Sequence, residues 1–311
     1  MPTDLDKTLA RAREISLREQ GPGLDIYTPG MITAYGRRGR YPAVSITADR
    51  CELGCEHCKG RLLETMLPAA APQELLELGR RLWRDGQAGM LLSGGSAPDG
   101  RMPWEPFIPV IARLSQETGL IITAHVGRID LATARALKEA GVRQALYDVV
   151  GEPAAAREIL HLPDGLAAQG ETLAACADAG LEMVPHIILG LHGGEMRGEG
   201  KALEIVAALD PGRVVFVVLM PLKGTPLARA TPPEPEEAAR FLALARERIP
   251  RARHSLGCAR PRGRYRRELD RLAVAAGINA LAIPSDGALG MAAELGIEVK
   301  YHQTCCSLSG G

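Results

Sequence analysis

Short apolar, β-rich runs alternate with amphipathic helical patterns along most of the chain. This alternation constrains the possible folds more than any other feature of the sequence. It predicts repeated βα units around a parallel sheet. The expected strands are residues 43–48, 89–92, 120–124, 144–150, 183–189, 213–220, 253–257 and 278–283. The expected helices are residues 72–84, 131–140, 171–179, 199–209, 235–248 and 265–276. Eight strands can close a barrel, so we expect an α/β fold, a (β/α)8 TIM-type barrel with N- and C-terminal extensions.

A doubly wound sheet would show the same alternation of strands and helices. Sequence alone does not show whether the sheet closes into a barrel. In either architecture the site lies at the carboxyl ends of the strands. We expect the barrel over residues 43–290. Residues 1–42 contain a helix and a lead-in rich in Gly, Pro and Tyr, expected to be irregular or a short hairpin. Residues 291–311 form a C-terminal tail.

The charge balance gives no sign of a nucleic-acid or membrane partner, because 37 Lys and Arg residues match 37 Asp and Glu residues. The N-terminal residues have no signal-peptide pattern, and no apolar run reaches about 18 residues. These features predict a cytoplasmic protein. Seven cysteines in such a protein argue for metal ligation by those that cluster, rather than for disulfides.

The loop after the first expected strand reads Cys51-Glu-Leu-Gly-Cys55-Glu-His-Cys58. Three thiolates on one loop can hold a 4Fe-4S cluster and leave one iron unliganded. Zinc is the alternative, but zinc sites use paired Cys-x-x-Cys or Cys and His sets with a fourth ligand nearby. His57 is poorly placed to be that ligand.

This Cys-x-x-x-Cys-x-x-Cys loop after the first strand of a βα barrel resembles the defining motif of the radical S-adenosylmethionine (SAM) superfamily. The resemblance covers most of the chain. It implies that SAM binds the open iron and is split to methionine and a 5′-deoxyadenosyl radical, which removes hydrogen from unactivated carbon. In such enzymes the protein orients the cofactor and excludes water.

The same resemblance points to residues that contact SAM. Ser93-Gly94-Gly95 resembles the Gly-Gly-Glu element that contacts the methionine amino group, with Ser96 in place of Glu; a tight turn with positive φ is the alternative. Asp148 and His125 fall where related enzymes hold ribose-binding polar residues, although Asp148 could equally be a helix cap or half of a loop ion pair. Gly190 begins a segment that resembles the adenine-contacting stretch.

Lys223-Gly-Thr-Pro-Leu227 resembles a stretch of biotin synthase, an enzyme that inserts sulfur into unactivated C–H bonds. Biotin synthase holds a second, sulfur-donating cluster on cysteines of inner strands and an arginine. The third and fifth expected strands contain no cysteine, so a biotin synthase proper is not expected.

This chain instead has Cys258 after the seventh expected strand and Cys305 and Cys306 in the tail. A strand end and a returning tail can meet, so these cysteines could bind a second 4Fe-4S cluster and act as the catalytic sulfur site. The tail also offers Ser307 or Ser309 as a further ligand. The alternative is that the tail cysteines have no role, whereas Cys176 on an alanine-rich helix is expected to pack.

The chain also resembles one member of a protein pair that divides lipoyl synthesis, through its lead-in, its cysteine loop and its Cys-Cys tail. Lipoyl synthase itself builds an auxiliary cluster from three cysteines and a C-terminal serine. The resemblance implies sulfur insertion into a carrier-bound octanoyl group, an acidic lipoyl carrier protein and a second radical SAM subunit. The alternatives are another radical reaction, such as methylation or rearrangement, and an iron-sulfur partner subunit without turnover.

Residues 246–271 contain ten basic and three acidic side chains. Such a segment is either a solvated surface or an attractive patch for an acidic carrier.

Overall fold

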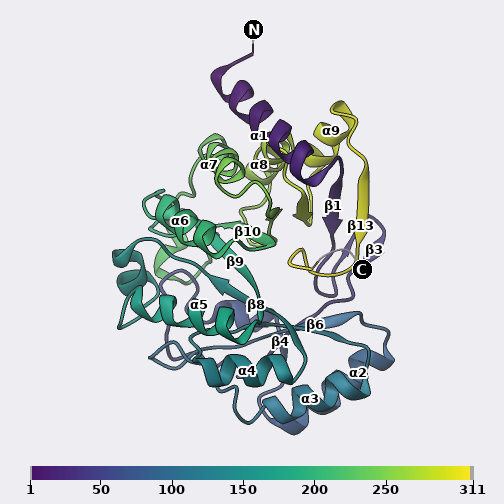
Figure 1. Ribbon diagram of the computed structural model, residues 1–311, viewed down its shortest axis with the longest axis vertical. Helices are drawn as coiled ribbons and strands as arrows, with labels where there is room; N and C mark the ends of the chain where they lie inside the picture. Colours follow the sequence, from purple (N-terminus) through teal and green to yellow (C-terminus); the bar gives the residue numbers. More distant parts are fainter. Residues whose placement is uncertain (1, 309–311) are drawn as a thin grey trace.

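The computed structural model describes residues 2–308 as a mixed α/β protein around an eleven-stranded sheet (Figure 1). The strands of this sheet are β1 (Leu24–Tyr27), β4 (Ala43–Ser45), β5 (Leu67–Pro68), β6 (Gly89–Ser93), β7 (Ile121–His125), β8 (Val142–Asp148), β9 (Glu182–Leu189), β10 (Arg213–Val218), β11 (Arg253–Leu256), β12 (Ala280–Ala282) and β13 (Val299–His302). Their order is β13-β1-β12-β11-β10-β9-β8-β7-β6-β4-β5, and neighbouring strands run parallel. The sheet curls into a half-barrel whose edges are β13 and β5.

All eight strands expected from the sequence are present, and they follow one another in the sheet as repeated βα units require. Three further strands were not expected, and one of them is the two-residue β5, which pairs with β4. β1 lies in the lead-in and β13 in the tail, and β1 pairs with both β12 and β13. The lead-in also contains the expected short hairpin, β2 (Thr33–Ala34) with β3 (Arg37–Arg38), whose turn residues Tyr35 and Gly36 have positive φ.

The helices cover the outer face of the sheet. They are α1 (Asp4–Gln20), α2 (Pro72–Arg84), α3 (Ile108–Glu117), α4 (Leu131–Glu139), α5 (Ala167–Ala179), α6 (Glu199–Leu209), α7 (Pro235–Arg248), α8 (Arg264–Ala275) and α9 (Asp286–Glu294). In α2 the apolar residues recur at helical spacing, so Leu75, Leu78 and Leu82 are buried on one face. No helix among residues 2–308 is long and apolar enough to cross a membrane.

The protein has an outer core, between helices and sheet, and a smaller inner core inside the curl of the sheet. Side chains alternate across a strand, so every second residue faces inward. The inner core contains strand residues such as Leu146, Val184 and Val215, and it also contains Cys306 of the tail. In Figure 1 the tail turns from β13 toward the middle of the molecule. Residues 303–308 therefore occupy the interior of the half-barrel.

Candidate active site

The loop between β4 and the 3₁₀ helix η1 (Arg61–Thr65) carries Cys51, Cys55 and Cys58. Backbone hydrogen bonds fold it tightly, because the N–H groups of Cys58 and Lys59 both donate to the Cys55 carbonyl, at 3.2 and 2.8 Å. Gly54 within the loop has a φ of 59°, which favours glycine. All three cysteine side chains line one cavity.

The three thiols are chemically suited to bind iron. Cys55 and Cys58 share a hydrogen bond, which lowers the pKa of Cys58 to about 4 and raises the pKa of Cys55. A thiolate is the form that ligates metal. Among residues 2–308, no three His, Cys, Asp or Glu side chains are gathered for a single metal ion. The thiolates of a 4Fe-4S cluster bind separate irons instead, so this donor set fits a cluster with three protein ligands.

The cavity has a volume of about 280 Å³ and opens between the cysteine loop and the carboxyl ends of β6, β7 and β8. Most of the residues predicted from the sequence to contact SAM lie in its wall. Its lining includes Ser93, Gly94, Gly95, His125 and Asp148. Their individual roles toward SAM stay predictions.

Gly94 and Gly95 are required by close packing rather than by backbone conformation. Neither has a positive φ, so the alternative of a turn with positive φ is wrong. A Cβ at Gly95 would collide with the Arg50 carbonyl and lie 2.5 Å from the Cα of Cys51. The Gly95 N–H donates to Thr47 Oγ1 at 2.7 Å. These glycines let the loop after β6 lie directly against the cysteine loop.

Beside Asp148 and His125, which line the cavity, lies a histidine that was not predicted from the sequence. His186 of β9 pairs in register with Asp148 of β8, and its ring centre lies 5.1 Å from that of His125. Burial lowers the pKa of both imidazoles, that of His186 to about 4, so both are neutral at pH 7. The signal in the sequence was a histidine near the end of a strand, at the spacing of an inward-facing residue.

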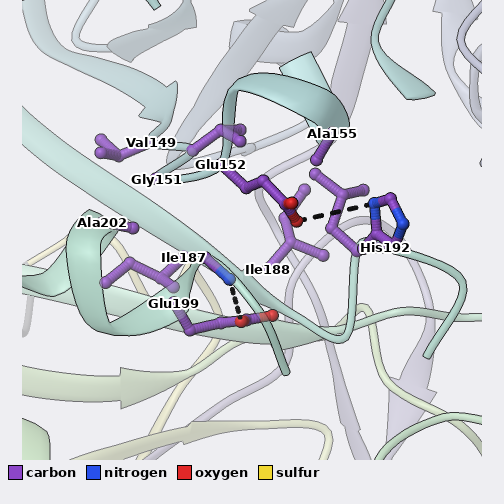
Figure 2. A pocket seen from close by; sticks show the side chains of 12 residues that line it. Val149, Gly151, Glu152, Ala155, Ile187, Ile188, His192, Glu199 and Ala202 are labelled. Carbon is purple, nitrogen blue, oxygen red and sulfur yellow. Dashed lines mark hydrogen bonds and ion pairs between the residues drawn. The ribbon is translucent and has the colours of Figure 1, made fainter. Parts of the chain in front are cut away.

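Gly190 lies outside the lining of this cavity. Its φ is 75°, a Cβ would lie 2.5 Å from Cδ of Pro233, and its N–H donates to Glu199 at 2.7 Å. Figure 2 shows the neighbouring small cavity, where Glu199, Glu152 and His192 flank the end of β9. Glu152 Oε2 lies 3.6 Å from His192 Nδ1. Local packing explains the glycine, and its contact with adenine stays a prediction.

Two of the second group of cysteines, Cys305 and Cys306, lie in the inner core of the half-barrel. The interaction between the Cys305 and Cys306 thiols lowers the pKa of Cys305 to about 6 and raises that of Cys306. Cys258, in the loop after β11, lies within electrostatic reach of both. Cys258 is exposed and Cys306 is buried. Ser309 lies outside the described residues, whereas Ser307 is fully buried beside the pair.

Hydrogen bonds from inward-facing side chains hold this tail. Arg213 Nη1 and Ser255 Oγ both donate to the Cys306 carbonyl, each at 3.0 Å. Tyr27 Oη donates to the Leu308 carbonyl at 2.9 Å. Cys176, by contrast, is fully buried in the outer core, where its expected packing role is seen.

The structure corrects the view of residues 246–271 as one basic patch. Arg246 and Arg260 are buried, and Arg260 forms a two-pronged ion pair with Asp270, at 2.8 and 3.0 Å. Arg266 donates to the carbonyls of Cys258 and Arg260, so it supports the loop that carries Cys258. The sequence could not reveal this, because burial depends on contacts between distant elements. Exposed basic side chains do remain beside this loop, at Arg262, Arg264 and Arg267.

The chain is similar to known proteins both in sequence and in fold. No protein-family model matches the chain. Biotin synthase of Cenarchaeum symbiosum is 25% identical over 263 residues, covering 81% of this chain and 76% of that protein. Biotin synthase of Pelotomaculum thermopropionicum is 28% identical over 246 residues, covering 77% and 75%.

Among solved structures, methylornithine synthase (PylB) matches with a TM-score of 0.63 and 15% identity, covering 97% of this chain and 91% of its own. HydG, a maturase of the [FeFe]-hydrogenase, matches with a TM-score of 0.67 and 14% identity, covering 91% of this chain and 62% of its own. These likenesses show the fold. The biotin synthase relatives and the cysteine loop place the chain in the radical SAM superfamily, in its biotin synthase-like branch.

Proposed function

We propose that this radical SAM enzyme inserts sulfur into an unactivated aliphatic chain, and that it does so as one of two proteins that divide lipoyl synthesis on a carrier-bound octanoyl group. The observation that carries the proposal is a second group of thiols, with Cys305 and Cys306 in the inner core and Cys258 within electrostatic reach of both. The biotin synthase names of the relatives support the same chemistry.

The residues around the second group of thiols favour a bound polar ligand. Three buried polar atoms there have no hydrogen-bond partner among the described residues, namely Thr304 Oγ1, Ser307 Oγ and Arg213 Nη2. Orphaned buried polar groups are rare in folded proteins. A second 4Fe-4S cluster, held by the three cysteines with Ser307 close by, would give these atoms partners. The donor set therefore fits such a cluster.

The cavity residues would place the substrate between the two groups. When bound, SAM on the first cluster supplies the hydrogen-abstracting radical, and the second cluster supplies the sulfur. Gly94 and Gly95 line the cavity beside the Cys51 loop, where SAM would bind, and Asp148 offers a carboxylate at the cavity wall. Leu146 lines this cavity and also belongs to the inner core with Val184, Val215 and Cys306, so its apolar side chain offers a contact for an aliphatic chain.

A carrier protein must dock where its arm can enter this cavity. Arg262, Arg264 and Arg267 are exposed in and after the loop that carries Cys258. Complementary charge speeds the encounter of protein partners. We therefore propose that these three arginines receive an acidic lipoyl carrier, with a second radical SAM subunit acting on the same carrier.

The first test counts iron and sulfide in protein reconstituted without oxygen. Two clusters give about eight irons per chain and one gives about four. Replacing Cys258, Cys305 and Cys306 together by alanine should remove about four irons and stop sulfur transfer, while 5′-deoxyadenosine still forms. Cys176→Ala is the matched control and should keep all the iron. Unchanged iron in the triple variant would overturn the second cluster.

The second test follows the sulfur. Protein reconstituted with heavy sulfide should pass the label into the product on an octanoylated carrier, because the proposal allows no other source. A product without label, or SAM cleavage without any C–S bond, would favour a methylation or rearrangement instead. Mass spectrometry of the carrier peptide distinguishes these outcomes.

A further inference from the structure

Arg213, the first residue of β10, is almost fully buried and contacts the tail directly. Its Nη1 donates to the Cys306 carbonyl at 3.0 Å and to Ser255 Oγ at 3.1 Å, and Ser255 Oγ donates to the same carbonyl at 3.0 Å. Two donors from adjacent strands thus hold one carbonyl of the tail. This is the carbonyl of a cysteine that the proposed second cluster would use.

The charge of Arg213 is not balanced by a carboxylate. No ion pair involving Arg213 occurs among residues 2–308, and the nearby Asp25 pairs with Arg253 and with His302 instead. A buried charge without a partner is costly. Its Nη2 is also one of the orphaned buried atoms. The side chain therefore has an unused donor and an unused positive charge beside two thiols.

We propose that Arg213 is a positioning residue that locks the tail inside the half-barrel through the Cys306 carbonyl and balances the charge of the sulfur-rich, anionic group bound by Cys305 and Cys306. The second part rests on the proposed function, whereas the lock does not. Two further orphaned atoms, Thr304 Oγ1 and Ser307 Oγ, lie on the same stretch of tail. All three would gain partners from one anionic group.

A second buried arginine provides a matched control. Arg246 of α7 donates to the carbonyls of Ala252 and Pro250, at 2.9 and 3.2 Å, and to Asn279 Oδ1 at 2.6 Å. It belongs to the outer layer and has no bond to the tail among the described residues. Arg246→Met therefore removes a buried guanidinium without touching the proposed lock.

The lock can be tested in cluster-free protein by measuring how fast each thiol is alkylated, with mass spectrometry to separate Cys258 from Cys305 and Cys306. Arg213→Met should speed alkylation of Cys305 and Cys306 by about tenfold or more, the factor expected for losing a hydrogen bond from a charged donor. Ser255→Ala should do so more weakly, and Arg246→Met should not. Wild-type rates in both Arg213→Met and Ser255→Ala would overturn the lock.

The proposed role of Arg213 in balancing charge can be tested by redox titration of each cluster, followed by electron paramagnetic resonance. Arg213→Met should make the second cluster harder to reduce and leave the first unchanged, Arg213→Lys should restore most of the potential, and Ser255→Ala should leave it unaltered. An unshifted potential in Arg213→Met with about eight irons bound would overturn the charge role. About four irons in the wild type would overturn the proposed function, while the alkylation rates would still decide the lock.

Discussion

Replacing Asp270 with alanine should strongly destabilise the protein, because the change removes the one carboxylate that pairs with the buried Arg260 among residues 2–308. Arg260 and Asp270 are both fully buried. Besides its two bonds to Asp270, Arg260 donates to the carbonyls of Gly257, Ala282 and Ile283. Asp270 Oδ2 in turn accepts from the Ser285 N–H at 2.8 Å. The pair ties the loop after β11, which carries Cys258, to α8 and to the end of β12.

Breaking a buried ion pair from one side costs about 3–5 kcal/mol, because the remaining charge stays buried without compensation. For a chain of this size, 1 kcal/mol corresponds to roughly 2 °C in Tm, so Asp270→Ala should lower Tm by about 6–10 °C. The double variant Arg260→Met/Asp270→Leu should recover part of this loss, since no lone charge remains. Recovery should be incomplete, because three carbonyls lose their donor.

Differential scanning calorimetry of cluster-free protein at one scan rate measures the effect. Arg262→Ala is the control, since Arg262 lies in the same loop but is exposed, and it should change stability by no more than about 0.5 kcal/mol. A fall in Tm of less than about 2 °C for Asp270→Ala would refute the reasoning. Arg260 would then have to be treated as part of the basic surface after all.

Alanine at Cys51, Cys55 or Cys58 should abolish SAM cleavage, because two thiolates cannot hold a cluster with one open iron; wild-type 5′-deoxyadenosine formation in any single variant would contradict this. Glutamate at Arg262, Arg264 and Arg267 should weaken binding of an octanoylated acidic carrier and flatten its salt dependence at unchanged Tm; unaltered affinity would remove the docking proposal. Asp130→Ala should cost about 1 kcal/mol at pH 7, because Asp130 Oδ1 caps α4 by accepting from the Thr133 N–H at 2.9 Å. That hydrogen bond lowers the folded pKa of Asp130 below 3.8, so the contribution is present above this unfolded value and is lost as pH falls through the folded pKa. Urea unfolding at pH 7 and pH 3 checks this, and a difference that does not shrink at pH 3 would speak against it.

Much of the scaffold was predictable because its signals are local. The strands β4 and β6 to β12 are apolar runs between amphipathic helices, and the sheet repeats that order. Parallel strands place their carboxyl ends at one edge, so the Cys51 loop, Gly95, His125 and Asp148 were expected near one another. They line one cavity. Spacing on a single loop was likewise enough to indicate a cluster site.

Other features depend on contacts between residues far apart in the chain, and only the tertiary structure decided them. β1 and β13 are four residues each and become strands by pairing with each other, while β1 also pairs with β12, and no local pattern records these pairings. The same holds for charge: Arg260, Arg262 and Arg266 look alike in sequence, yet the first is buried, the second exposed and the third bound to the Cys258 loop. The tail cysteines reach the inner core because Arg213 and Ser255, on neighbouring strands, bind one tail carbonyl. Sequence determined which groups the chain carries, and packing determined which of them face the site, because burial is a property of the whole fold.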